Sequence, residues 1–256
     1  MKVTTMKKSS LFLILIFSIF ANIVLAESPQ GIYTKANLNY ENENFEEAIF
    51  LYETLVEMDS ASAEVFYNLG NSYFKLKRIG KAILNYERSL RMMPRDRDAR
   101  LNLKLARTMT VDKIESPDKG FVLNAVFFLY DRMNINELTF LASFFYLIVI
   151  TLLIFSIFFV AKRKTLFYTT GAFGITLVLV LVFLIAKIHS ENFIKTSVVV
   201  VDKVDVRSGP KEDYSLQFTL HEGTTLRVVE ERQSWYEIDL SKDLKGWLPK
   251  DSVEII

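Results

Sequence analysis

Two long apolar stretches dominate the pattern of hydrophobic and polar positions along the chain. Residues 138–161 and 166–186 are each long enough to cross a hydrocarbon core, which takes roughly 20 apolar residues in a helix. Only the four residues 162–165, three of them cations, separate the stretches. So short a connection predicts antiparallel helices, and a positively charged loop favours the cytoplasmic side of a membrane. We therefore predict a transmembrane hairpin whose two flanking segments lie together on the opposite side.

The start of the chain, at positions 1–26, has the pattern of a secretory signal peptide. Lys2, Lys7 and Lys8 precede an apolar segment at residues 11–25, and Val24-Leu25-Ala26 resembles a cleavage site. An uncleaved anchor helix is the alternative interpretation. Under both interpretations the residues that follow are exported, in agreement with the topology predicted from the hairpin.

Between residues 27 and 110, apolar positions recur at the three- and four-residue spacing of amphipathic helices. Two helices are predicted between Ala63 and Pro94, and we interpret Gly80 as the residue that breaks the chain between them. The positions that define the pattern are Phe66, Leu69, Gly70, Tyr73, Ala82, Tyr86 and Pro94. In type and spacing they resemble the tetratricopeptide repeat, a helix–turn–helix unit of about 34 residues.

The same spacing indicates a more degenerate first repeat. One repeat length before Ala82 and Tyr86, the chain has Ala48 and Tyr52. One further helix, at residues 99–109, is expected to cap the stack with a solvated face. Residues 27–110 are therefore predicted to form a small all-α solenoid.

The resemblance implies a groove that binds an extended peptide or a partner's helix. It implies that Tyr67, Asn71 and Phe74 lie at this groove, where Asn71 bonds the backbone of a ligand. Residues 27–59 carry eight acids and one lysine, whereas residues 61–110 carry eleven cations and four acids. This split is either a polarised groove that orients a charged partner or, as we favour, a set of ordinary solvated helix faces.

Residues 111–137 connect the helical repeats to the first apolar stretch. They include a polar linker and ten mostly apolar residues at 121–130, which are too few to span a bilayer. These ten residues are interpreted either as an interfacial helix, as we favour, or as a segment that packs against the first repeat.

The two long apolar stretches have the composition of an anchor. Neither has an ionisable residue in its middle, which argues against transport by this chain alone. Gly171 and Gly174 form a small-residue face that packs either on the other helix, as we favour, or on a helix of another subunit.

Closely spaced strand signals fill residues 196–256 and predict about five short strands. The blocks VRSGP, LHEGT, WYEIDL and GWLP occur in the order typical of the bacterial SH3-like domain, an all-β small barrel that this segment resembles. His221, beside a predicted turn, is interpreted as a plain surface residue. Aromatic residues that could form a binding rim are Tyr214, Phe218, Trp235, Tyr236 and Trp247, of which we favour a core position for Trp247.

Composition argues against several classes of function. The 256 residues carry a formal charge of +1, with no cysteine and only two histidines. Thiol catalysis is thereby excluded, a zinc site or a Ser-His-Asp triad has no support, and no charge bias indicates nucleic acid. We predict a non-enzymatic protein without catalytic residues, a cofactor or a metal site.

Exported repeats, a membrane hairpin and an exported SH3-like domain, in this order, resemble the BatE-type proteins of bacterial aerotolerance operons. The resemblance implies a two-pass protein of the bacterial inner membrane, with both domains in the periplasm and a link to oxidative stress. It also implies membrane partners, among them proteins with von Willebrand A-type domains. We predict a membrane-anchored scaffold; the alternative is a module that binds peptidoglycan through the SH3-like domain.

Overall fold

The computed structural model describes residues 28–113, 130–241 and 244–256. The predicted signal peptide and nearly all of the apolar segment at 121–130 lie outside the described residues. The chain divides between Ala61 and Ser62 into two compact units.

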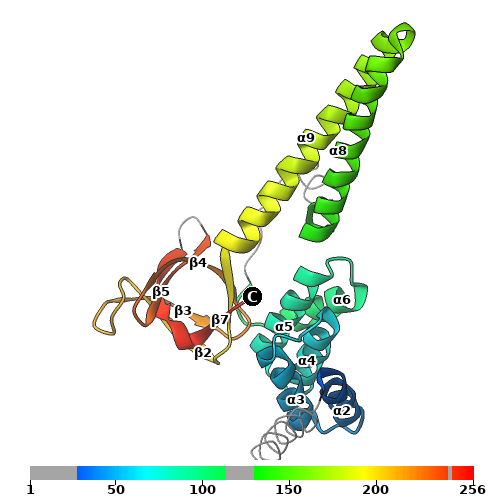
Figure 1. Cartoon of the computed structure of the whole chain (residues 1–256). Helices are drawn as coiled ribbons and strands as arrows, with labels where there is room; N and C mark the ends of the chain where they lie inside the picture. Colours follow the sequence, from blue (N-terminus) through cyan, green and yellow to red (C-terminus); the bar gives the residue numbers. More distant parts are fainter. Residues whose placement is uncertain (1–27, 114–129, 242–243) are drawn as a thin grey trace, which may run out of the picture. The chain divides into compact units, whose positions relative to one another are not determined.

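The first unit contains a pair of helices, α2 (Pro29–Glu41) and α3 (Phe45–Glu57) (Figure 1). Ala48 is completely buried, so a larger side chain would not fit at this position of the pair. The Tyr52 hydroxyl donates a hydrogen bond of 2.5 Å to the side-chain oxygen of Asn37. The degenerate first repeat therefore has a packed helix pair of its own.

The second unit begins with three helices, α4 (Ala63–Lys75), α5 (Ile79–Met92) and α6 (Arg97–Thr108). The prediction that Gly80 breaks the chain between the first two is wrong, because Gly80 lies in the first turn of α5. The chain reverses instead at Lys77, whose φ of 61° is left-handed and cannot continue a right-handed helix.

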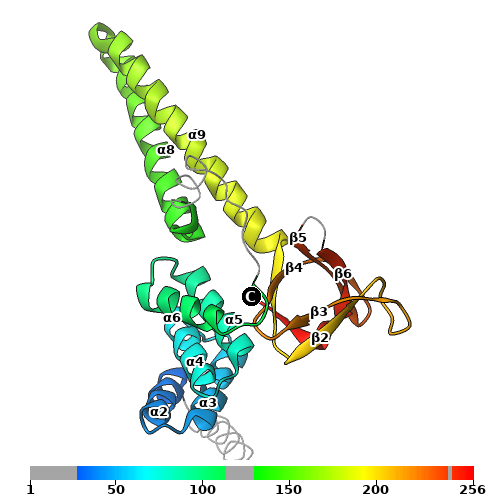
Figure 2. The same ribbon diagram turned by 180° about the vertical axis from the view of Figure 1, so that it is seen from behind.

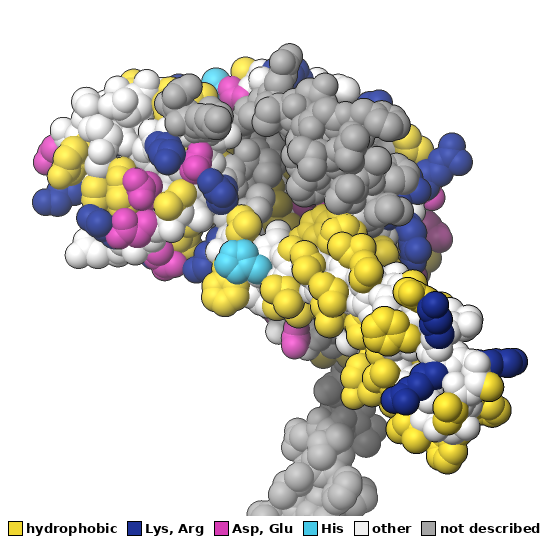
Figure 3. All heavy atoms as spheres, turned by 90° about the horizontal axis from the view of Figure 1, so that it is seen from above, with side chains coloured by type: hydrophobic (Ala, Val, Ile, Leu, Met, Phe, Trp, Pro, Cys, Tyr) yellow, Lys and Arg dark blue, Asp and Glu magenta, His cyan; other side chains and the backbone are white. Residues whose placement is uncertain are grey.

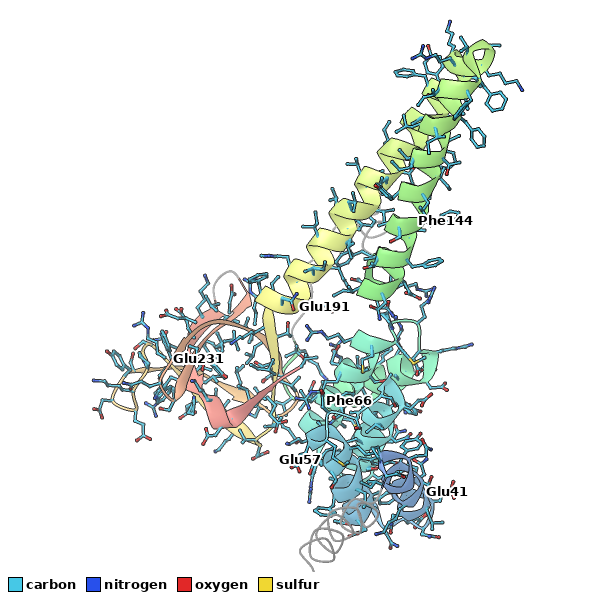
Figure 4. All side chains as sticks on the ribbon, viewed as in Figure 1. Glu41, Glu57, Phe66, Phe144, Glu191 and Glu231 are labelled. Atoms are coloured by element: carbon cyan, nitrogen blue, oxygen red, sulfur yellow. The ribbon has the colours of Figure 1, made fainter. Side chains whose placement is uncertain are left out.

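Two long apolar helices, α8 (Ile135–Phe158) and α9 (Arg163–Phe193), follow as a hairpin (Figures 1 and 4). Each is long and apolar enough to cross a membrane. Their turn is the 3-10 helix η1 (Val160–Lys162), about three residues earlier than predicted, and α9 continues past residue 186. Residues 187–193 contain no glycine or proline that would end α9 sooner.

The side chains of this hairpin are mostly apolar and exposed, with cations at its turn (Figure 3). The small face of α9 does not pack on α8 as we had favoured: a Cβ atom added at Gly171 or Gly174 would meet nothing within 4 Å. Bulky rings make the helix contact instead, with the centroids of Phe145 and Phe173 6.1 Å apart.

Seven described strands that begin at Lys195 and end at Ile255 form an antiparallel sheet that curves into a small barrel (Figure 2). The prediction of about five strands was too low, in part because the final segment divides at the 3-10 helix η2 (Lys250–Ser252). The sheet order is β3-β2-β6-β5-β4-β1-β7. The strands are β1 (Lys195–Val199), β2 (Lys203–Arg207), β3 (Leu216–His221), β4 (Thr225–Arg232), β5 (Trp235–Ser241), β6 (Leu244–Pro249) and β7 (Val253–Ile255).

Aliphatic side chains fill the interior of the barrel. Alternate residues of each strand point inward, and the buried set forms one core cluster. Its members are Val199, Val204, Val206, Leu220, Leu226, Val228, Ile238, Leu248 and Val253.

Candidate interaction sites on the second repeat and the barrel

The three groove residues predicted from the repeat share one face of α4. Tyr67, Asn71 and Phe74 are spaced by four and three residues, so they lie one above another on the helix. All three side chains are half-buried. This arrangement leaves part of each side chain accessible to a partner.

Hydrogen bonds hold Asn71 in this face. Its side-chain oxygen accepts from the Tyr86 hydroxyl at 2.8 Å and from the side-chain amide of Asn102 at 2.9 Å. The Asn102 amide also donates to the Tyr67 hydroxyl at 3.2 Å. The acceptor of Asn71 is thus used internally, whereas its NH₂ group makes no hydrogen bond within the part of the chain that the structure describes. Asn71 can serve a ligand only as a donor.

A close crossing of α4 and α5 positions this network. A Cβ atom added at Gly70 would lie 2.8 Å from the Tyr86 ring, and Ala82 is completely buried. Small residues at these two positions therefore let the Tyr86 hydroxyl reach α4. The first repeat contains the same tyrosine–asparagine bond one repeat length earlier, between Tyr52 and Asn37.

Sequence reasoning missed two exposed leucines of α6, the helix whose Asn102 bonds Tyr67 and Asn71. Leu101 and Leu105 of α6 are 53% and 51% exposed, so the exposed side of this last helix carries two large apolar side chains. They lie one repeat length after Tyr67 and Asn71, and this signal could have identified them. We call the surface made by Tyr67, Asn71, Phe74, Leu101 and Leu105 the α4–α6 surface.

The barrel does not bring the predicted rim aromatics together. Phe218 and Tyr236 pack against the barrel core, because their side of each strand faces inward. Trp247 is buried, as we favoured, under the guanidinium of Arg232 at 5.2 Å from its ring centroid. Tyr214 is exposed in the turn between β2 and β3, and Trp235 is half-buried at the start of β5. In the described ranges, no ring contact joins Tyr214, Trp235 and Tyr236.

His221 is not the plain surface residue that we predicted. Its backbone N–H donates to Asp112 at 2.8 Å, and its ring Nδ1 lies 3.0 Å from the other oxygen of the same carboxylate. The Thr224 hydroxyl donates to Asp112 at 2.6 Å. Burial opposes ionisation of Asp112, but the hydrogen bonds from Thr224 and His221 outweigh it and lower the pKa of this carboxyl.

The lowered pKa of Asp112 predicts a pH-dependent contribution to stability. Asp112→Asn will lower the stability of the chain by on the order of 1 kcal/mol at pH 5.5, because ionised Asp112 accepts bonds that an amide accepts less well. This difference is present above the unfolded pKa of about 3.9 and is lost as the pH falls through the lower folded pKa. Thermal unfolding of both proteins at pH 5.5 and pH 3 measures the difference. A difference in stability between the two proteins that is larger at pH 3 than at pH 5.5 would contradict the lowered pKa of Asp112.

The part of the chain that the structure describes contains no group of three or more His, Cys, Asp or Glu side chains that could hold a metal ion. The observed features of the α4–α6 surface are aromatic and aliphatic side chains around amide groups. Such a surface suits recognition of another macromolecule.

Comparison with known families agrees with this geometry. Residues 202–254 match the bacterial SH3 domain, residues 63–96 match the tetratricopeptide repeat, and residues 36–77 match the TPR repeat. No curated protein matches the chain. The chain thus combines two kinds of module that typically make interactions rather than catalyse reactions.

Proposed function

We propose that this protein is a membrane-anchored, non-enzymatic scaffold of the bacterial inner membrane, with its repeats and its barrel in the periplasm. The observation that carries the proposal is the α4–α6 surface, which combines half-buried aromatic residues of α4 with exposed leucines of α6. Its partners are other membrane subunits, with proteins containing von Willebrand A-type domains as candidates. A role in tolerance of oxygen or oxidative stress belongs to the same proposal.

Exposure of large apolar side chains supports the membrane anchor. Phe140, Ile157 and Phe158 of α8 are 74%, 72% and 75% exposed. A patch of this kind is unfavourable in water but suits a hydrocarbon environment. Lys162, Arg163 and Lys164 at the turn support a cytoplasmic position for that end.

The chemistry of the α4–α6 surface supports binding of a largely apolar helix or extended segment. Aromatic anchors that keep part of their area exposed are frequent hot spots of interfaces. The NH₂ group of Asn71 adds a donor that can pair with a main-chain carbonyl of the partner.

Substitutions on this surface test the scaffold. We expect Tyr67→Ala with Phe74→Ala to abolish co-purification of membrane partners cross-linked in native membranes. Each lost anchor weakens binding by roughly 2 kcal/mol, or about 30-fold, so the two together weaken it by on the order of 1,000-fold. Leu101→Ser with Leu105→Ser should weaken it as well. Because these leucines are exposed, this second variant leaves the helix core intact.

Phe50→Ala on α3 is the matched control, since Phe50 is also an exposed aromatic residue (64%) but lies outside the surface. Partner recovery should be unchanged in this control. Undiminished recovery with both surface variants, each shown to be folded by circular dichroism, would contradict the scaffold.

Binding to peptidoglycan is the second candidate, and the match of residues 202–254 to the bacterial SH3 domain favours it. Exposed Tyr214 and half-buried Trp235 are the remaining candidates for such contacts. Retention of the full chain on purified sacculi, lost in Trp235→Ala and kept in Tyr67→Ala with Phe74→Ala, would support this function in place of the scaffold.

A further inference from the structure

One face of α5 that looks solvated in the sequence is bonded to the barrel. The backbone N–H of Gly80 donates to the Glu222 carboxylate at 2.8 Å. Further along the same helix, Arg88 donates to the main-chain oxygen of Ile255 at 2.6 Å. Lys81 forms an ion pair with Glu254. These contacts join the start of α5 to the turn between β3 and β4 and to β7, and a later turn of the helix to β7.

Glu222 supplies what the N-terminus of α5 lacks. The first N–H groups of a helix have no partner within the helix, and the N-cap residue Arg78 makes no side-chain hydrogen bond to them. A carboxylate at this end also interacts favourably with the helix dipole. Burial raises the pKa of the Glu222 carboxyl, partly offset by its bond to Gly80.

Apolar residues are buried beside these polar contacts. Val198 of β1 is completely buried, yet it is not a member of the barrel core, and strand alternation points it away from its core neighbour Val199. β1 packs against α5. Leu84, completely buried, lies on the same face of α5 as Gly80 and Arg88, at four-residue spacing.

Two glycines permit this close approach. A Cβ atom added at Gly80 would lie 2.4 Å from the main-chain oxygen of Val199. Gly223 has a left-handed φ of 85°, and a Cβ there would lie 2.6 Å from Thr110 and 2.9 Å from Ile83. Any side chain at either position would separate the surfaces.

We infer that the outward face of α5 is a docking surface whose partner is the barrel of the same chain, so that the second repeat and the SH3-like barrel act as one body. A partner held at the α4–α6 surface is thereby presented in a constant orientation to the barrel. External ligands of the barrel must bind away from β1, β7 and the β3–β4 turn.

A designed disulfide tests the docking in the full chain. The chain has no cysteine, so Asp112→Cys with Thr224→Cys introduces the only pair, at positions whose side-chain oxygens are 2.6 Å apart. In lipid nanodiscs under mild oxidation, we expect most chains to form the intramolecular bond, detected as a joined peptide by mass spectrometry. In the control pair, Asp112→Cys with Gln217→Cys, the second cysteine occupies an exposed position of β3. We expect the disulfide bond of this control pair to form at least about 10-fold more slowly. Equal rates for both pairs would overturn the inference.

A charge exchange provides a second test that leaves Asp112 intact. Lys81→Glu alone should accelerate hydrogen exchange of the first amides of α5 by roughly 10-fold, because it places two carboxylates together. Adding Glu254→Lys should restore slow exchange. Exchange that is unchanged by the single substitution, or not restored by the second, would overturn the inference.

Discussion

Replacing Gly80 with alanine is expected to destabilise the chain by about 1–3 kcal/mol, the usual range for overpacking. The same change in an exposed helix stabilises it by up to about 1 kcal/mol, because alanine has the higher helix propensity. Here the added Cβ meets the main-chain oxygen of Val199 at 2.4 Å. That oxygen belongs to β1, which is paired on both sides with β4 and β7 and cannot move alone. Thermal unfolding in detergent micelles measures the change.

Gly171→Ala is the matched control, since it makes the same substitution inside a helix. An added Cβ there has open space around it, so the change should be neutral or stabilising. Hydrogen exchange should also accelerate at the start of α5 in Gly80→Ala only. If Gly80→Ala is as stable as Gly171→Ala, α5 and the barrel are not in the contact described above.

The second large effect is expected at Tyr86. Tyr86→Ala should lower the stability of the second repeat by about 3–5 kcal/mol, because it leaves a cavity where a side chain only 1% exposed now packs. Tyr86→Phe keeps the ring beside Gly70 and removes the hydroxyl with its hydrogen bond to Asn71. Its expected cost is about 1 kcal/mol.

Urea unfolding followed by far-ultraviolet circular dichroism separates the two tyrosine variants. The phenylalanine variant should also weaken partner recovery, since Asn71 then loses one of the two bonds that orient its NH₂ group. Equal losses of stability in both variants would show that the hydroxyl, and not the packing of the ring, holds the helices together.

Much of the fold was predictable because it depends on spacing along the chain. The hairpin follows from two apolar stretches matched to a bilayer, and the repeat follows from small and aromatic residues at helical spacing. Gly70, Ala82 and Tyr86 have the packing role that the repeat pattern predicts. The exact turn between α8 and α9 was missed by about three residues, since apolar composition alone does not say where a helix ends.

The candidate sites were predicted less completely. Tyr67, Asn71 and Phe74 share a face, but the bonds that use the acceptor of Asn71 depend on Tyr86 and on Asn102 of another helix. Leu101 and Leu105 were overlooked because their helix was treated as a polar cap. On the barrel, the sequence did not show that Phe218 and Tyr236 pack against the core.

By itself, the sequence determined the kinds of element, their order and their buried faces, because periodicity and composition encode local structure and the need for burial. Only the tertiary structure decided which residues the outward face of α5 contacts. Gly80, Lys81 and Arg88 look like a helix break and a solvated face, yet their partners lie 142, 173 and 167 residues away along the chain. No local pattern specifies such a partner, because a charged side chain has the same appearance in sequence whether it contacts water or a distant carboxylate.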